Sequence, residues 1–272
     1  MTRPTVGILG AGSMGEIIAL GLSRAGWEPS DLVLAVRRTE RVRDLEHTTG
    51  SVTTLSLAEA AVDRDVVVIA VKPKDVPHVL GEIADIMTTD QVIVSIAAGV
   101  PISVFEAALV NIPVVRAMPN TPSAVDFGMT AYTVGSTASD DHAARAQTVL
   151  GAVGLTIEVS EDLLDAVTAV SGTGPAYVFL MAEALIEAAI REGLPHHAAE
   201  KLVHQTVRGA GELLSTSDKS AFRLRGEVTS PGGTTAAAMH VLEDGGFRAL
   251  LENAVRAAAE RSRELGKRVS DQ

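Results

Sequence analysis

The first part of this chain alternates short β-branched runs with segments whose apolar residues follow helical spacing. Such alternation predicts βαβ units, in which right-handed crossover helices join parallel strands. The predicted strands are residues 5–9, 32–36, 66–71, 92–96, 113–116, 129–134 and 155–159. An α/β fold with a doubly wound, Rossmann-type sheet follows from this pattern.

The alternation stops near Glu161, and almost no strand pattern follows it. The apolar residues now recur with a period of 3.6, which predicts helices. The predicted helices are residues 163–170, 177–190, 198–214 and 247–265. We therefore expect a Rossmann domain over residues 1–160 and an all-α domain over residues 161–272, joined by a helix near Asp162.

A glycine-rich turn follows the first predicted strand at once. Gly10-Ala11-Gly12-Ser13-Met14-Gly15 lies between this strand and an amphipathic run that ends at Leu22. In this strand–turn–helix setting, G-x-G-x-x-G binds a dinucleotide whose pyrophosphate rests on the helix N-terminus. The alternative is a glycine turn in an α/β fold that binds something else.

The end of the second predicted strand indicates which dinucleotide is bound. An NAD enzyme usually carries Asp or Glu there, to accept a hydrogen bond from the ribose 2′-hydroxyl. Here the strand runs into Arg37-Arg38. Because a guanidinium suits a 2′-phosphate, NADPH is the expected cofactor, with NADH still possible. The alternative is a solvated basic turn.

Two later predicted strands end in residues suited to a ligand at the carboxyl edge of the sheet. Lys72 and Pro73 follow the run 66–71, and Ala97-Ala98 follow the run 92–96. Ligands of doubly wound folds bind at this edge, and small side chains let a flat nicotinamide ring come close. These residues are therefore candidates for cofactor binding.

A second candidate anion site lies far along the chain, in Ser230-Pro231-Gly232-Gly233-Thr234-Thr235. Ser230 as N-cap and Pro231 at the first helical position predict a helix that begins there. The free N–H groups of Gly232 and Gly233 could then hold a small carboxylate, and the two threonines add hydroxyls. A tight turn with no ligand is the alternative.

The predicted helix 177–190 is apolar nearly all round, interrupted mainly by Glu183 and Glu187. A helix that is hydrophobic on every face must be covered on every face. One small helical domain offers limited cover, so we expect burial between two subunits of a homodimer. The glutamate pair is most simply a solvated stripe.

Composition excludes several other classes of protein. The chain carries 23 Lys+Arg against 34 Asp+Glu, and this acidic balance argues against nucleic-acid binding. It has no cysteine, which excludes disulfides and thiolate chemistry. His196, His197 and His204 lack a further ligand at metal-site spacing, so no metal is expected. A strand beginning by Thr5 leaves no room for a signal peptide, and the apolar runs 66–71 and 92–96 are too short for a membrane. A cytoplasmic protein without membrane partners is expected.

Taken together, these motifs resemble the pyrroline-5-carboxylate reductase family, in order and over essentially the whole chain. The matching segments are 10–15, Ala70-Val71-Lys72-Pro73, Met118-Pro119-Asn120, 171–177 and 228–235. The resemblance implies a Rossmann domain followed by a helical dimerisation and substrate domain, often assembled as a ring of dimers. It also implies reduction of 1-pyrroline-5-carboxylate to L-proline with NAD(P)H, the last step of proline biosynthesis.

The site residues follow from the motifs and the resemblance together. The expected cofactor-binding residues are Leu9, Gly10, Ala11, Gly12, Ser13, Met14, Gly15, Arg37, Arg38, Ala70, Val71, Lys72, Pro73, Ala97 and Ala98. The expected substrate-binding residues are Ser230, Gly232, Gly233, Thr234 and Thr235. The N–H groups of Gly233 and Thr234 would hold the substrate carboxylate, and Thr235 would act catalytically through its hydroxyl on the ring nitrogen.

Two other functions remain open. A β-hydroxyacid dehydrogenase has the same two-domain plan but needs a catalytic lysine on the first long helix of its second domain, and this chain has no lysine between Lys74 and Lys201. A non-catalytic NADP(H) sensor would keep the dinucleotide site, but it has no need of the glycine–threonine loop.

Overall fold

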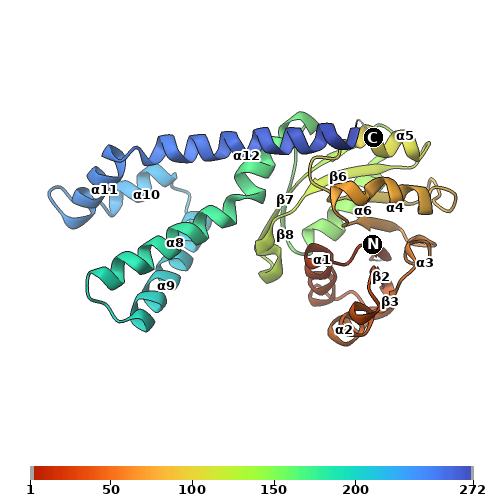
Figure 1. Ribbon diagram of the computed structural model, residues 1–272, viewed down its shortest axis with the longest axis horizontal. Coiled ribbons are helices and arrows are strands. Elements are labelled where there is room, and N and C mark those ends of the chain that lie inside the picture. Colours follow the sequence, from red (N-terminus) through yellow and green to blue (C-terminus); the bar gives the residue numbers. More distant parts are fainter. Residues whose placement is uncertain (1–2, 271–272) are drawn as a thin grey trace. The chain divides into compact units, whose positions relative to one another are not determined.

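A single sheet organises the N-terminal part of the protein. The computed structural model describes residues 3–270, and side chains as far as residue 266. Among these residues, eight strands form a sheet of order β3-β2-β1-β4-β5-β6-β7-β8 (Figure 1). The strands are β1 (Val6–Leu9), β2 (Leu32–Ala35), β3 (Val52–Thr54), β4 (Val66–Ile69), β5 (Val92–Ser95), β6 (Val114–Met118), β7 (Gly128–Val134) and β8 (Gly154–Glu158).

Helices cover both faces of the sheet and give it two apolar cores. The helices of this part are α1 (Ser13–Arg24), α2 (Thr39–Thr49), α3 (Leu57–Ala61), α4 (Val76–Ile83), α5 (Ile102–Ala108), α6 (Asp140–Gly151) and α7 (Leu164–Val167). Side chains of α1, α2 and α6 pack in one core, and side chains of α3, α4 and α5 pack in the other. This is the expected doubly wound architecture.

The seven predicted strands are confirmed, with ends that shift by no more than two residues. The sequence pattern missed β3, a three-residue edge strand too short to show a period. Neighbouring strands from β3 to β6 are parallel, whereas β7 runs antiparallel to β6. The connection from residue 119 to 127 is shorter than a parallel crossover needs, and this explains the reversal.

The remainder of the described chain is helical, as expected. It contains α8 (Gly174–Arg191), α9 (His196–Thr216), α10 (Ala221–Glu227), α11 (Thr234–Asp244) and α12 (Phe247–Ser270). The helical unit is held in part by Glu243, which accepts hydrogen bonds from Arg248 (2.7 Å) and Arg225 (3.0 Å). Both guanidiniums, Arg248 foremost, hold the pKa of the Glu243 carboxyl below its ordinary value.

The compact units of the structure differ from the predicted division at residue 160. One unit ends at Thr173 and resumes at Ala257, and the other spans Gly174–Arg256. Side-chain contacts explain the difference. Glu161 accepts hydrogen bonds from Arg116 (2.9 Å) and from the N–H of Ile102 (2.7 Å). Ser262 on α12 donates to Asp165 (2.5 Å), so the second half of α12 belongs to the Rossmann unit.

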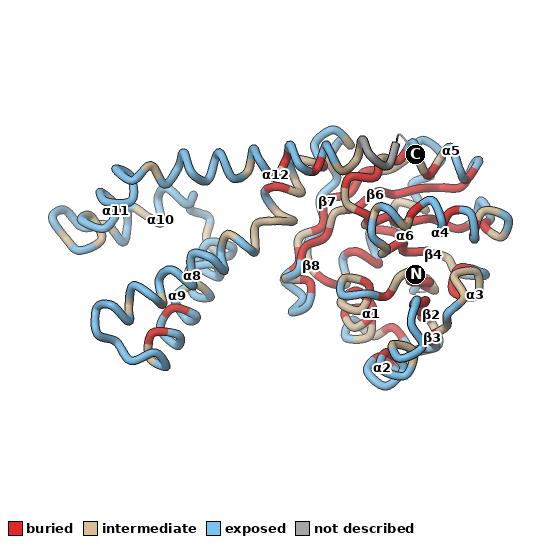
Figure 2. The backbone as a smooth tube through the Cα atoms, in the orientation of Figure 1, coloured by how far each residue is buried: buried red, intermediate tan, exposed pale blue. Residues whose placement is uncertain are grey.

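Helix α8 has no buried residue, and its trace in Figure 2 changes between pale blue and tan. Phe179 and Leu180 are each 66% exposed, although both are large and apolar. By length and composition, one helical run among the described residues, 161–191, could also cross a membrane. A single run of this kind is weak evidence, and its apolar residues equally suit contact with another protein chain.

We predict that Leu185→Asp breaks the oligomer and yields unfolded or aggregated protein. Leu185 is 45% exposed in the single chain, and burying an unpaired carboxylate against a second chain costs on the order of 2–5 kcal/mol. Light scattering after size-exclusion chromatography measures the outcome. Val110→Asp is the control, because Val110 is 73% exposed in the Rossmann unit. A native chain that is a folded, monodisperse monomer would contradict the prediction.

Candidate cofactor and substrate sites

The crevice for a ligand opens where the strand order reverses, between β1 and β4. Gly10 leaves β1 with φ +86°, a conformation that favours glycine. A Cβ on Gly10 would lie 2.4 Å from Cγ1 of Val71, which follows β4. The turn can therefore pass this close to β4 only because residue 10 has no side chain.

The turn leads into a helix end whose first N–H groups have no partner within the helix. Gly12 is the N-cap residue of α1, and the first helical hydrogen bond is donated by Glu16 to the carbonyl of Gly12 (2.8 Å). The N–H groups of Ser13, Met14 and Gly15 are thus free of helical acceptors. A Cβ on Gly12 would meet only one atom, the Gly10 oxygen at 3.9 Å. This open N-terminus fits a pyrophosphate.

Arg37 and Arg38 follow β2, as expected, and both are exposed. The Arg37 side chain is 76% exposed and forms an ion pair with Asp75, with 3.0 Å between Nη1 and Oδ2. Arg38 is the N-cap residue of α2 and its side chain makes no capping bond. A guanidinium at the end of β2 fits a 2′-phosphate, because the two are complementary in charge and geometry.

Arg37 lines a pocket of about 290 Å³ that begins at the glycine turn. The full lining is Gly10, Ala35, Val36, Arg37, Leu55, Leu57, Val71, Lys74, Asp75, His78, Val79 and Glu82. Sequence reasoning missed its far wall, formed by residues 74–82. The signal was available, since these residues follow the carboxyl end of a strand in a doubly wound sheet.

The other predicted cofactor residues lie at neighbouring strand ends. Ala70 donates its N–H to Leu9 O (2.8 Å), which joins the ends of β4 and β1. Lys72 is exposed and Ala97 is buried. Beside Ala98, Gly99 has φ +78°, and its Cβ would lie 3.1 Å from the nitrogen of Gly266 on α12. The glycines at positions 99 and 266 thus let α12 come close to the segment after β5.

Asn120 joins two of the recognised motifs within the Rossmann unit. It is 9% exposed, and its amide donates to both the carbonyl and the hydroxyl of Ser171 (3.2 Å each). Its Oδ1 accepts from the N–H of Met129 (2.9 Å). The Ser171 segment lies in a π-helical turn (Thr168–Gly172), a local form frequently found at functional sites.

The Ser230–Thr235 loop differs from its predicted form. The helix does not begin at Pro231; α11 begins at Thr234, with Gly233 as N-cap. Pro231 and Gly232 instead form a turn, closed by the N–H of Gly233 on Ser230 O (3.1 Å), with Gly232 at φ +70°. Proline followed by a positive-φ glycine is typical of a type II turn, so proline here starts a turn rather than a helix.

Because α11 begins at Thr234, the free backbone N–H groups lie further along the chain. The N–H of Gly233 is already bonded, and the first helical bond runs from Ala237 N–H to Gly233 O (3.1 Å). The N–H groups of Thr234, Thr235 and Ala236 are therefore the ones without helical acceptors. The arrangement still suits a carboxylate, although of the predicted donors Gly232, Gly233 and Thr234 only Thr234 is among the three. This loop belongs to the helical unit, whereas the predicted cofactor residues belong to the Rossmann unit.

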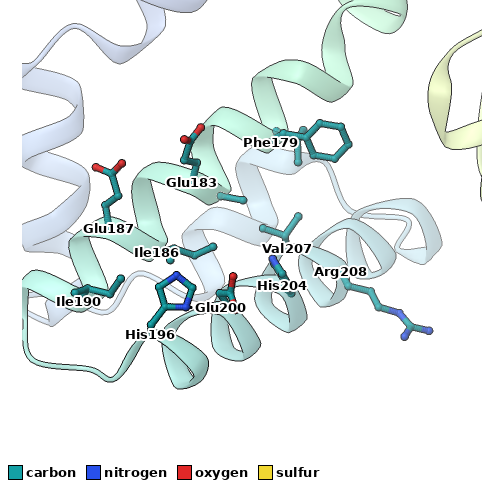
Figure 3. Close-up of a pocket in the computed structure, with 12 residues that line it drawn as sticks. Phe179, Glu183, Ile186, Glu187, Ile190, His196, Glu200, His204, Val207 and Arg208 are labelled. Carbon is teal, nitrogen blue, oxygen red and sulfur yellow. Dashed lines mark ion pairs between the residues drawn. The ribbon is translucent and has the colours of Figure 1, made fainter.

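A larger pocket of about 610 Å³ lies between α8 and α9 (Figure 3). Its walls carry Ile186, Ile190 and Val207, with acidic residues and histidines around them. Among the described residues, no cluster of three or more His, Cys, Asp or Glu side chains could hold a metal ion. Glu187 pairs with Arg191 (2.9 Å) and not with Glu183, as expected for a surface stripe.

Family models match both parts of the chain. Residues 161–265 match the model for pyrroline-5-carboxylate reductase dimerisation. Residues 5–99 match the model for NADP oxidoreductase, coenzyme F420-dependent. The first match covers the exposed helix α8, and the second covers the glycine turn and Arg37. The protein is accordingly a homo-oligomer that contains a dinucleotide-binding domain. Its substrate is a small molecule.

Relatives match the chain over nearly its full length. The pyrroline-5-carboxylate reductase of Corynebacterium melassecola is 40% identical over 267 residues, covering 97% of this chain and 99% of the relative. That of Mycobacterium tuberculosis is 42% identical over 284 residues, covering 96% of each. A solved reductase from Coxiella burnetii is 39% identical with a TM-score of 0.91, covering 97% and 99% of the chains. A Plasmodium falciparum pyrroline carboxylate reductase, solved with NADP bound, is 31% identical with a TM-score of 0.88, covering 98% and 99%.

We predict that Gly12→Ala keeps the fold but weakens NADPH binding at least about tenfold, because the added methyl fills space that a pyrophosphate would occupy. The free energy of unfolding should change by about 1 kcal/mol or less, since the methyl meets no close neighbour. Thermal unfolding and a nucleotide titration measure the two effects. Gly10→Ala is the contrast and should lose about 1–3 kcal/mol of stability through strain and the Val71 clash. If Gly12→Ala binds NADPH with native affinity, the pyrophosphate does not bind at the N-terminus of α1.

Proposed function

The chain belongs to the pyrroline-5-carboxylate reductase family, and on this premise we propose that it reduces 1-pyrroline-5-carboxylate to L-proline with NADPH or NADH. This reaction is the last step of proline biosynthesis. One observation carries the proposal: relatives of this name are about 40% identical to the chain across both of its units. The free helix ends at Ser13 and Thr234 support it independently.

The Rossmann unit supplies the residues that would hold the cofactor. The N–H groups of Ser13, Met14 and Gly15 suit the pyrophosphate, and Arg37 suits a 2′-phosphate. Ala97 and Ala98 are small residues that follow β5, and they would let the nicotinamide ring come close to the end of that strand. When bound, the reduced nicotinamide would supply a hydride to the carbon of the substrate C=N bond, and one proton from solvent on the nitrogen would complete the amine.

The Thr234–Ala236 helix end would hold the substrate carboxylate. Its three N–H groups lack helical acceptors, and the helix dipole places partial positive charge there. Gly232 and Gly233 shape the turn before it, and a Cβ on Gly233 would lie 2.3 Å from the Ser230 hydroxyl oxygen. We therefore keep Ser230, Gly232 and Gly233 in the substrate loop, where they set the backbone path.

Thr235 would place its hydroxyl on the ring nitrogen. That nitrogen becomes more basic as the C=N bond is reduced, so a nearby hydroxyl can donate to it more strongly in the transition state than in the ground state. Thr235 is half-buried and Thr234 is exposed. The reaction needs orientation more than strong acid catalysis, and the loop accordingly contains no Lys, His or Asp.

The two other functions lack support from the site. A β-hydroxyacid dehydrogenase would need a lysine on α8, and Gly174–Arg191 contains none. A sensor without catalysis would keep the glycine turn but has no use for an open helix end beside two threonines.

The assembly and location follow from the same reasoning. The exposed apolar helix α8 and its family match support a dimer, and we propose that dimers assemble further into a ring. A net charge of −11 and the absence of a basic stripe argue against nucleic-acid partners. We assign the apolar helix to the oligomer rather than to a membrane, and the protein to the cytoplasm.

We predict that Thr235→Val lowers kcat for pyrroline-5-carboxylate roughly ten- to a hundredfold, because a hydrogen bond in a desolvated site is worth on the order of 1–3 kcal/mol. Valine keeps the shape of threonine and removes the hydroxyl. Affinity for NADPH should hardly change, since the loop belongs to the other compact unit. Steady-state kinetics with both substrates varied measure the effect.

Thr234→Val is the matched control. Thr234 is proposed to act through its backbone N–H, which valine retains, so kcat should stay within about threefold of native. If Thr234→Val loses kcat while Thr235→Val keeps it, the two roles are reversed. If neither variant loses activity, the loop is only a turn.

A further inference from the structure

The Arg37 guanidinium already has a carboxylate partner at the place where a 2′-phosphate would bind. Nη1 of Arg37 lies 3.0 Å from Oδ2 of Asp75, and both residues line the pocket beside the glycine turn. The Arg37 side chain is 76% exposed, whereas the Asp75 side chain is only 25% exposed. Asp75 is thus the more buried partner of the pair and Arg37 the more exposed one.

The backbone places Asp75 between a short turn and the start of α4. Asp75 ends the short 3₁₀ turn η2 (Pro73–Asp75), and its N–H bonds to the carbonyl of Lys72 (2.9 Å). It also precedes α4 as the N-cap residue, yet its side chain makes no capping hydrogen bond. An N-cap aspartate usually accepts from the first turn of its helix. Here its carboxylate binds Arg37 instead.

We propose that Asp75 sets the balance between NADPH and NADH by occupying Arg37. The 2′-phosphate of NADPH would have to take the guanidinium from Asp75, whereas NADH has only a 2′-hydroxyl there and makes no such demand. The ion pair therefore lowers affinity for NADPH selectively. A carboxylate thus influences cofactor choice although none stands at the end of β2, and it reaches the pocket from the loop after β4.

Other charges at this pocket are arranged differently. Lys74 is exposed, and His78 pairs with Glu82 on α4, with 3.0 Å between Nε2 and Oε1. Glu82 therefore adds a carboxylate to the same pocket without binding the arginine. It provides a matched way to separate the specific pair from the general charge of the pocket.

Isothermal titration calorimetry on the full chain without substrate tests this role. It measures the dissociation constants of NADPH and of NADH for the native chain and for the variant Asp75→Asn. Asp75→Asn removes the charge and keeps the size. NADPH should bind about three- to fivefold more tightly, the scale of one exposed ion pair, while NADH stays within about twofold. Weaker NADPH binding would show that Asp75 positions Arg37 productively, and an unchanged ratio of the two constants would also overturn the proposal.

Two further variants make the test specific. Glu82→Gln should leave the ratio of NADPH to NADH affinity within about twofold, and a shift as large as that of Asp75→Asn would assign the effect to pocket charge in general. Arg37→Ala should weaken NADPH and spare NADH. In that background Asp75→Asn should lose its effect on NADPH, and an equal effect in both backgrounds would show that Asp75 does not act through Arg37.

The inference rests on the proposed cofactor use, and the measurement separates the two. A native chain that binds neither nucleotide overturns both claims. A native chain that binds both, with the ratio unchanged in Asp75→Asn, overturns only the role of Asp75.

Discussion

The contact between Gly10 and Val71 is the constraint on which the cofactor site depends. It brings the turn after β1 against the end of β4, at the point where the strand order reverses, and leaves no room for a Cβ. The turn then delivers α1 with its first N–H groups free. Arg37 and Val71 line the pocket beside this turn, and the N–H of Ala70 on Leu9 O ties the end of β4 to that of β1. A larger residue at position 10 would push the turn away from the end of β4 and so disturb the whole cofactor site.

The helical unit answers a different physical demand. In α8 no residue is buried, although the helix is apolar on most sides and the structure describes all of it. Such a surface in water is unfavourable by roughly 25 cal/mol per Å² of apolar area, so it favours association of the chains. The loop at Thr234 belongs to this unit, whereas the N-terminus of α1, proposed to bind the nucleotide, belongs to the other unit. The proposed dimer surface and the proposed substrate loop thus lie in the same compact unit.

The sequence predicted the features that depend on local pattern. Seven strands, the helical second part and the glycine turn each have a period or a motif within a few residues. It did not predict β3, which is too short, or the reversal of β7, which depends on the length of the preceding connection. A helix start at Pro231, which the sequence predicts, is wrong because proline suits both a helix start and a turn, and Gly232 with φ +70° forms the turn. The Arg37–Asp75 pair joins two distant loops, so only the folded sheet reveals it.

NADPH oxidation by the purified protein, followed at steady state with pyrroline-5-carboxylate, tests the proposed reaction most directly. A 3-hydroxy acid with NADP⁺, run in the opposite direction, serves as the comparison substrate. We expect oxidation that depends on pyrroline-5-carboxylate and yields proline, with no turnover of the hydroxy acid. Turnover of the hydroxy acid alone would contradict the proposed reaction and would indicate a β-hydroxyacid dehydrogenase.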